Sequence, residues 1–123
     1  MANILLVEDD KDLIEAYALV LKAAKHNIKK AYDGKQALVA VKEFNPDLIL
    51  LDLLMPVKSG KEFLKEYKKD KASKDVKIIV FSNLQDSNEL EDVYSLGADR
   101  YIIKSWTGPH GLLKIVGEVL ATE

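Results

Sequence analysis

Acidic, hydroxyl and ammonium side chains stand directly after four short apolar runs of this sequence. Glu8 and Asp9 follow the first of these runs, Asp52 ends another, and Ser82 and Lys104 end two more. Three carboxylates brought together repel one another, and a hard divalent cation such as Mg²⁺, which prefers oxygen ligands, would neutralise them. An aspartate carboxylate can attack a phosphoryl group, while a hydroxyl and an ammonium can stabilise charge on the phosphoryl oxygens. These residue types predict a phosphoryl-transfer site centred on Asp52.

Each of these residues, taken alone, also has an ordinary structural explanation. An aspartate at a strand end is often a turn residue or a helix cap, which would account for Asp52. The cluster Glu8-Asp9-Asp10 could simply be favourable charge at the start of the following helix. Ser82 could be a cap, and Lys104 a surface lysine. The functional interpretation therefore depends on all of them falling at strand ends.

The apolar runs alternate with longer stretches of helical periodicity. We expect strands over 4–7, 27–32, 48–51, 77–81 and 101–103, and helices over 12–24 (capped by Asp12), 37–44, around 63–67, around 90–94 and over 112–119. The continuous apolar run Leu48–Leu51 is typical of a strand buried on both faces. Strict alternation predicts an α/β fold, a doubly wound five-stranded parallel sheet with helices on both faces. Ligands of such sheets bind outside the carboxyl ends of the strands, where the candidate residues lie.

Composition bounds the class of protein. The 123 residues, 48% hydrophobic and 31% charged, suit a single domain spanning 1–123, and the absence of cysteine excludes disulfides and thiolate metal sites. A formal net charge of −2 without a basic patch argues against a nucleic-acid partner. No apolar run approaches the roughly 20 residues of a membrane span, and a strand pattern beginning at once leaves no signal peptide. We expect a cytoplasmic protein that does not bind membranes.

Several short motifs lie along this chain at characteristic places. They are Val7-Glu8-Asp9, Asp52 with Met55-Pro56 and Gly60, Ser82, Gly97-Ala98, and Tyr101 to Lys104. At these motifs the chain, from Ile4 to Leu120, resembles the receiver domain of bacterial response regulators, the family of the chemotaxis response regulator. The resemblance implies a flavodoxin-like fold with strand order 2-1-3-4-5.

The resemblance also implies a role for each candidate residue. Asp52 would be the phosphoacceptor, and Glu8, Asp9, Asp52 and the backbone carbonyl of Leu54 would hold Mg²⁺. Ser82 and Lys104 would contact the phosphoryl group. Tyr101 would change rotamer together with Ser82. The protein would then be no enzyme beyond phosphorylating itself and slowly losing the phosphoryl group.

The implied partners are proteins. A sensor histidine kinase or a phosphotransfer protein would donate the phosphoryl group. A downstream protein would bind the face formed by the fourth helix, the fifth strand and the fifth helix, where Tyr94 and Trp106 lie. No output domain follows Glu123, so we expect a stand-alone receiver domain.

The chain departs from the family at two positions. Proline with a cis peptide usually follows the lysine of the fifth strand, but here Ser105 follows Lys104. Because a cis bond before a residue other than proline costs roughly 2.5–4 kcal/mol, we expect a trans Lys104–Ser105 peptide and a different path through 105–108 into the last helix. Asn83 stands where a very small residue is common. Both departures are expected to affect the conformational change that follows phosphorylation more than the phosphorylation chemistry.

Other readings fit less well. An aspartate-nucleophile phosphatase needs a second Asp two residues after the first, where this chain has Leu54. Gly34-Lys35 and Gly60-Lys61 lack the rest of a P-loop, and acids replace the phosphate loop of a flavin-binding domain. A receiver-like interaction module that is no longer phosphorylated remains an alternative.

Overall fold

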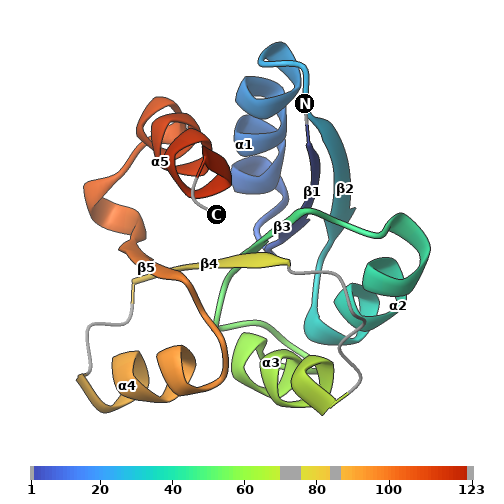
Figure 1. The fold of residues 1–123 in the computed structure, drawn as a ribbon, viewed down its shortest axis with the longest axis vertical. Coiled ribbons are helices and arrows are strands. Elements are labelled where there is room, and N and C mark those ends of the chain that lie inside the picture. Colours follow the sequence, from blue (N-terminus) through green and yellow to red (C-terminus); the bar gives the residue numbers. More distant parts are fainter. Residues whose placement is uncertain (1, 70–75, 84–86, 122–123) are drawn as a thin grey trace.

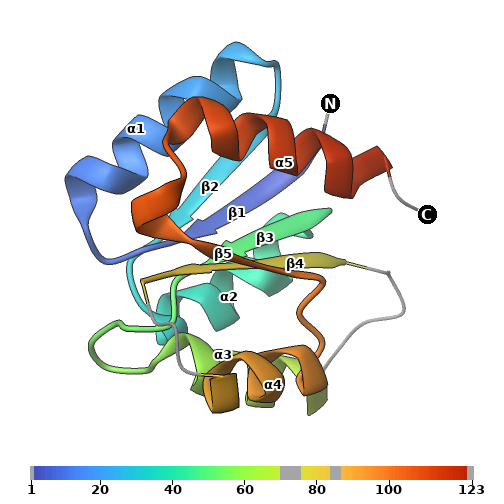
Figure 2. The same cartoon turned by 90° about the vertical axis from the view of Figure 1, so that its left-hand side faces the viewer.

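The chain forms a five-stranded parallel sheet with helices on both faces (Figure 1). A computed structural model describes residues 2–69, 76–83 and 87–121. The strands are β1 (Asn3–Val7), β2 (Asn27–Ala31), β3 (Leu48–Leu51), β4 (Lys77–Ser82) and β5 (Arg100–Ile103), in the order β2-β1-β3-β4-β5. The helices are α1 (Lys11–Ala23), α2 (Gly34–Phe44), α3 (Gly60–Lys69), α4 (Ser87–Ser95) and α5 (Pro109–Ala121). Helices α1 and α5 cover one face, and α2, α3 and α4 cover the other (Figures 1 and 2). The predicted fold class and strand order are confirmed.

Helix caps explain where the first two helices begin. The Asp10 carboxylate accepts hydrogen bonds from the backbone N–H groups of Asp12 (3.1 Å) and Leu13 (3.2 Å), so Asp10 caps α1. The expectation that Asp12 is the cap was therefore wrong. Asp12 lies in the first turn of α1, where its charge complements the helix dipole. Asp33 caps α2 in the same way, accepting from the backbone N–H of Gln36 at 2.8 Å.

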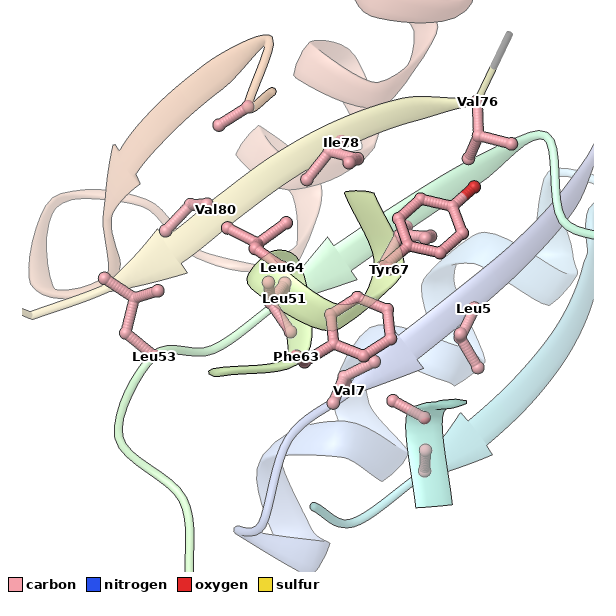
Figure 3. Close-up of a cluster of buried hydrophobic side chains, with 14 of the residues drawn as sticks. Leu5, Val7, Leu51, Leu53, Phe63, Leu64, Tyr67, Val76, Ile78 and Val80 are labelled. Carbon is pink, nitrogen blue, oxygen red and sulfur yellow. The ribbon is translucent and has the colours of Figure 1, made fainter. Parts of the chain in front are cut away.

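Alternate residues of the central strands fill two cores, one on each side of the sheet. Leu5, Val7 and Leu51 pack beneath α3, against side chains that include Phe63 and Tyr67 (Figure 3). The intervening strand residues face α1 and α5. Strands β1 and β3 are thus apolar on both faces, which is why they read as continuous hydrophobic runs. The edge strand β2 is only partly buried.

The register of the sheet brings the ends of the strands to one edge. Val7 pairs with Leu51, and Ser82 pairs with Ile103. The residues that follow the strands therefore emerge side by side.

The peptide bond between Lys104 and Ser105 has the geometry expected for a residue other than proline. No peptide bond among the described residues is cis, so the Lys104–Ser105 bond is trans as predicted. A short 3₁₀ turn, η1 (Lys104–Trp106), then leads to α5, which begins at Pro109. Within the described residues, no helix is long and apolar enough to cross a membrane.

Candidate functional site

Three carboxylates meet at the carboxyl edge of the sheet. Glu8 and Asp52 are buried, with 4% and 5% of their surface exposed, and Asp9 is exposed. The backbone N–H of Asp52 donates to the carbonyl of Val7 at 3.0 Å, which extends the pairing of β3 with β1 by one residue. As a result, carboxylate oxygens of Glu8, Asp9 and Asp52 all lie within 4.8 Å of one another. The structure thus brings together the three acids that the sequence singled out.

Lys104 places its ammonium between two of these acids. Its Nζ lies 3.3 Å from Oδ2 of Asp52 and also pairs with Oε1 of Glu8. The Lys104 side chain is 14% exposed, so water screens these ion pairs only in part. One ammonium opposes three carboxylates, and the cluster carries an excess of negative charge.

Burial dominates the acid–base properties of the site. It raises the pKa of Glu8 from 4.5 to about 7, although the hydrogen bond to Lys104 opposes this shift. Burial also raises the pKa of Asp52, against the charge and hydrogen bond of Lys104 and a hydrogen bond from the backbone of Leu54. For Lys104, burial alone would lower the pKa, but its contacts with Glu8 and Asp52 raise it overall. The lysine therefore stays charged, and further positive charge would favour the ionised forms of Glu8 and Asp52.

Such a cluster suits a divalent cation and an incoming phosphoryl group. Carboxylate oxygens on neighbouring loops are the ligands that Mg²⁺ prefers, and the excess negative charge favours its binding. The Asp52 carboxylate lies within 4.8 Å of those of Glu8 and Asp9, and it contacts the Lys104 ammonium. A carboxylate so placed can act as a nucleophile, because the Lys104 ammonium, together with a divalent cation held by the acids, would stabilise the charge of the incoming phosphoryl oxygens.

The other predicted residues lie near the site in different ways. Ser82 ends β4 and is buried, one strand away from Asp52. Leu54 exposes 62% of its surface just beyond Asp52. Tyr101, on β5, is half-buried and packs against the core beneath α3 and α4. The structure does not bring Tyr101 into the acidic cluster itself.

Two further residues belong to the surroundings of the site, and sequence reasoning missed both contributions. Tyr17 of α1 lines a small cavity together with Glu8 and Asp52, and burial raises its pKa. Helical spacing placed Tyr17 on the buried face of α1 without showing that it lies near the acids. Asn83 accepts a hydrogen bond from the backbone N–H of Ser105, which no sequence pattern indicated.

Comparison with known proteins places this geometry in one class. Residues 4–116 match the response regulator receiver domain family. The DNA-binding response regulator MtrA of Mycobacterium tuberculosis is 36% identical over 102 residues, covering 83% of this chain and 43% of that protein. The phosphate regulon transcriptional regulatory protein PhoB of Pseudomonas aeruginosa is 32% identical over 105 residues, covering 85% of this chain and 46% of that protein. The chain thus spans about half the length of these relatives.

A solved structure of similar length has the same fold. The chemotaxis protein CheY4 of Vibrio cholerae superposes with a TM-score of 0.88 at 27% identity, over 97% of this chain and 98% of that one. The fold and the acidic edge define a receiver domain of two-component signalling. This chain belongs to the response regulator receiver domain family.

Proposed function

We propose that Asp52 accepts a phosphoryl group in a Mg²⁺-dependent phosphorelay, and that its phosphorylation changes the surface of the domain. The observation that carries this proposal is the position of the Lys104 ammonium, 3.3 Å from Asp52 within a cluster of three carboxylates. A lysine with a purely structural role needs only one acidic partner. Lys104 contacts two, and it places its positive charge beside Asp52, the proposed nucleophile. Residues 1–123 would work as one receiver domain.

The proposed transfer exchanges one bond to phosphorus for another. A carboxylate oxygen of Asp52 forms a bond to phosphorus while the bond to the imidazole nitrogen of a phosphohistidine on the donor breaks. The electron pair of the broken bond stays on the nitrogen, and the imidazole ring takes up one proton from solvent, so that it leaves as a neutral histidine side chain. The product is an acyl phosphate on Asp52.

Other residues of the site would stabilise the charge of the phosphoryl oxygens. Lys104 would contribute its ammonium, and Ser82 its hydroxyl, to these oxygens. Glu8, Asp9, Asp52 and the backbone carbonyl of Leu54 would hold Mg²⁺, whose charge supplies further electrostatic stabilisation. Tyr101 would change rotamer with Ser82 and so carry the change to the surface.

The proposed partners are proteins of a cytoplasmic signalling system. A sensor histidine kinase or phosphotransfer protein would donate to Asp52, and a downstream protein would bind the face of α4, β5 and α5. Exposed aromatic side chains on that side, Tyr94 (44% exposed) and Trp106 (75% exposed), support this choice. With a formal net charge of −2, this domain is not expected to bind nucleic acid or membranes itself.

Phosphorylation by a small-molecule donor tests the proposal directly. Acetyl phosphate with Mg²⁺ should add one phosphoryl group to the wild type, detected by intact mass, and none to Asp52→Asn. Asp33→Asn is the matched control, because asparagine caps a helix as well as aspartate does, and it should be phosphorylated normally. A wild type that takes no phosphoryl group would leave the interaction module as the better description. A phosphorylated Asp52→Asn would mean that another residue is the acceptor.

A further inference from the structure

Asn83 and Ser105 are joined by a hydrogen bond across the carboxyl edge of the sheet. The backbone N–H of Ser105 donates to the side-chain oxygen Oδ1 of Asn83 at 2.9 Å. The regular pairing of β4 with β5 ends at Ser82 and Ile103, one residue before Asn83 and two residues before Ser105. The side chain of Asn83 therefore provides one more link between the two chain segments, after their backbones have stopped pairing.

This link lies directly beside Lys104. Ile103, before Lys104, is held in the β4–β5 ladder, and Ser105, after it, is held by Asn83. The backbone carbonyl of Lys104 also accepts a hydrogen bond from the N–H of Thr107 at 3.2 Å, which closes the η1 turn. The backbone on both sides of Lys104 is thereby fixed.

The fixed backbone matters because the side chain of Lys104 is long. A lysine loses much rotamer freedom when its ammonium is held in one place, and movement of its Cα would move the ammonium as well. The ammonium must lie between Glu8 and Asp52 to contact both. A displacement of about 1 Å at a reacting group can cost as much as 100-fold in rate.

We propose that Asn83 is a positioning residue for Lys104: through its hydrogen bond to the Ser105 backbone, it holds the Lys104 ammonium at Asp52. The link requires an N–H at position 105, which any residue except proline supplies, and an acceptor of the length of Asn or Asp at position 83. Its effect on phosphorylation rests on the proposed function, and its effect on the position of Lys104 does not.

A comparison of single and double variants tests the kinetic part. Phosphorylation by acetyl phosphate with Mg²⁺ should be about threefold to tenfold slower in Asn83→Ala than in the wild type, since one hydrogen bond typically corresponds to a factor of ten or less. In a Lys104→Ala background, Asn83→Ala should have no further effect, because residues that act through one another are not additive. Equal slowing in both backgrounds would show that Asn83 acts independently of Lys104, and no slowing in either would show that it has no such role.

A measurement without phosphorylation tests the positional part. At constant pH, the NMR order parameter of the Lys104 ammonium should fall in Asn83→Ala and recover in Asn83→Asp, which keeps an oxygen acceptor. Asn27→Ala is the matched control, because it removes an exposed asparagine hydrogen bond, to Asn3 at 3.1 Å, at the opposite edge of the sheet. It should leave the order parameter unchanged. An order parameter unaffected by Asn83→Ala would overturn the inference, and this result can be obtained even if the wild type takes no phosphoryl group.

Discussion

Gly60 packs directly against the backbone of Asp52. A Cβ atom at position 60 would lie 2.1 Å from the carbonyl oxygen of Asp52 and 2.9 Å from the Cα of Leu53. The N–H of Gly60 also donates to the carbonyl of Leu53 at 3.0 Å, so α3 begins pressed against the strand end that carries the proposed acceptor. No side chain other than hydrogen fits here without moving Asp52.

Gly60→Ala should therefore destabilise the fold. We expect a loss of about 2 kcal/mol or more in the free energy of unfolding, because the added methyl group meets backbone atoms that cannot turn away. Gly117→Ala is the matched control: nothing lies within 4 Å of its added Cβ, and alanine in a helix should stabilise by roughly 0.5–1 kcal/mol. Urea unfolding measures both. Equal stability of the two variants would contradict the packing argument.

Val57 holds an unfavourable backbone conformation. Its φ of 67° lies in the left-handed region, which a β-branched residue rarely adopts, and its side chain is 77% exposed. Val57→Asn should raise the free energy of unfolding by about 1 kcal/mol, since asparagine tolerates this region and little packing is lost. Val39→Asn replaces another exposed valine within α2, where no such strain exists, and should bring no gain. A similar change in both variants would show that the strain at Val57 is not stored in the native state.

The parts of this protein that sequence predicted are those set by local pattern. The apolar run Leu48–Leu51 placed β3 without error, because burial on both faces leaves a continuous signal. The cap of α1 was misplaced from Asp10 to Asp12, since several acids in a row offer equivalent caps. The sequence also predicted that Glu8, Asp9, Asp52 and Lys104 lie close together, because the carboxyl ends of parallel strands meet at one edge of the sheet. The roles proposed for Ser82 and Tyr101 stay predictions.

Contacts that depend on the register between loops were beyond sequence reasoning. The bond between Asn83 and Ser105 exists because β4 and β5 stop pairing at a particular residue, which no spacing along the chain reveals. The position of Tyr17 near the acids depends likewise on where α1 lies over the sheet.

The raised pKa of Glu8 predicts that the metal-free protein becomes less stable as pH rises. With a folded pKa of about 7 and an unfolded value of 4.5, the native state binds more protons between these values. The free energy of unfolding should therefore fall between about pH 4.5 and pH 7, and the raised pKa of Asp52 acts in the same direction. Urea unfolding in the presence of a chelator measures the slope. Glu8→Gln should reduce it, and an unchanged slope in that variant would exclude Glu8 as its source.

Mg²⁺ should stabilise the wild type against heat. A ligand that binds only the native state at ten times its Kd adds about 1.4 kcal/mol, which corresponds to a rise in Tm of roughly 3–6 °C for a domain of this size. Asp9→Asn should lose most of this rise, and because Asp9 is exposed, the substitution leaves no buried group unpaired. Asp33→Asn should keep the full rise. If the wild type shows no shift at millimolar Mg²⁺, the three carboxylates do not form a metal site.

The phosphorylated form should be long-lived, because the residue two positions after Asp52 is apolar. Hydrolysis requires a water molecule in line with the acyl phosphate, and a polar side chain beside the site would orient it. Leu54 lies there, 62% exposed, with its backbone hydrogen-bonded to the Asp52 carboxylate. The residue two positions after Ser82, Leu84, is apolar as well and lies outside the described residues.

Leu54→Asn should therefore shorten the lifetime of the phosphorylated protein several-fold, because a water molecule held in line with the acyl phosphate attacks more readily than a free one. Decay can be followed by intact mass after the phosphoryl donor has been removed. Unchanged decay in Leu54→Asn would show that water is already oriented by other groups, and that an apolar residue at this position does not set the lifetime.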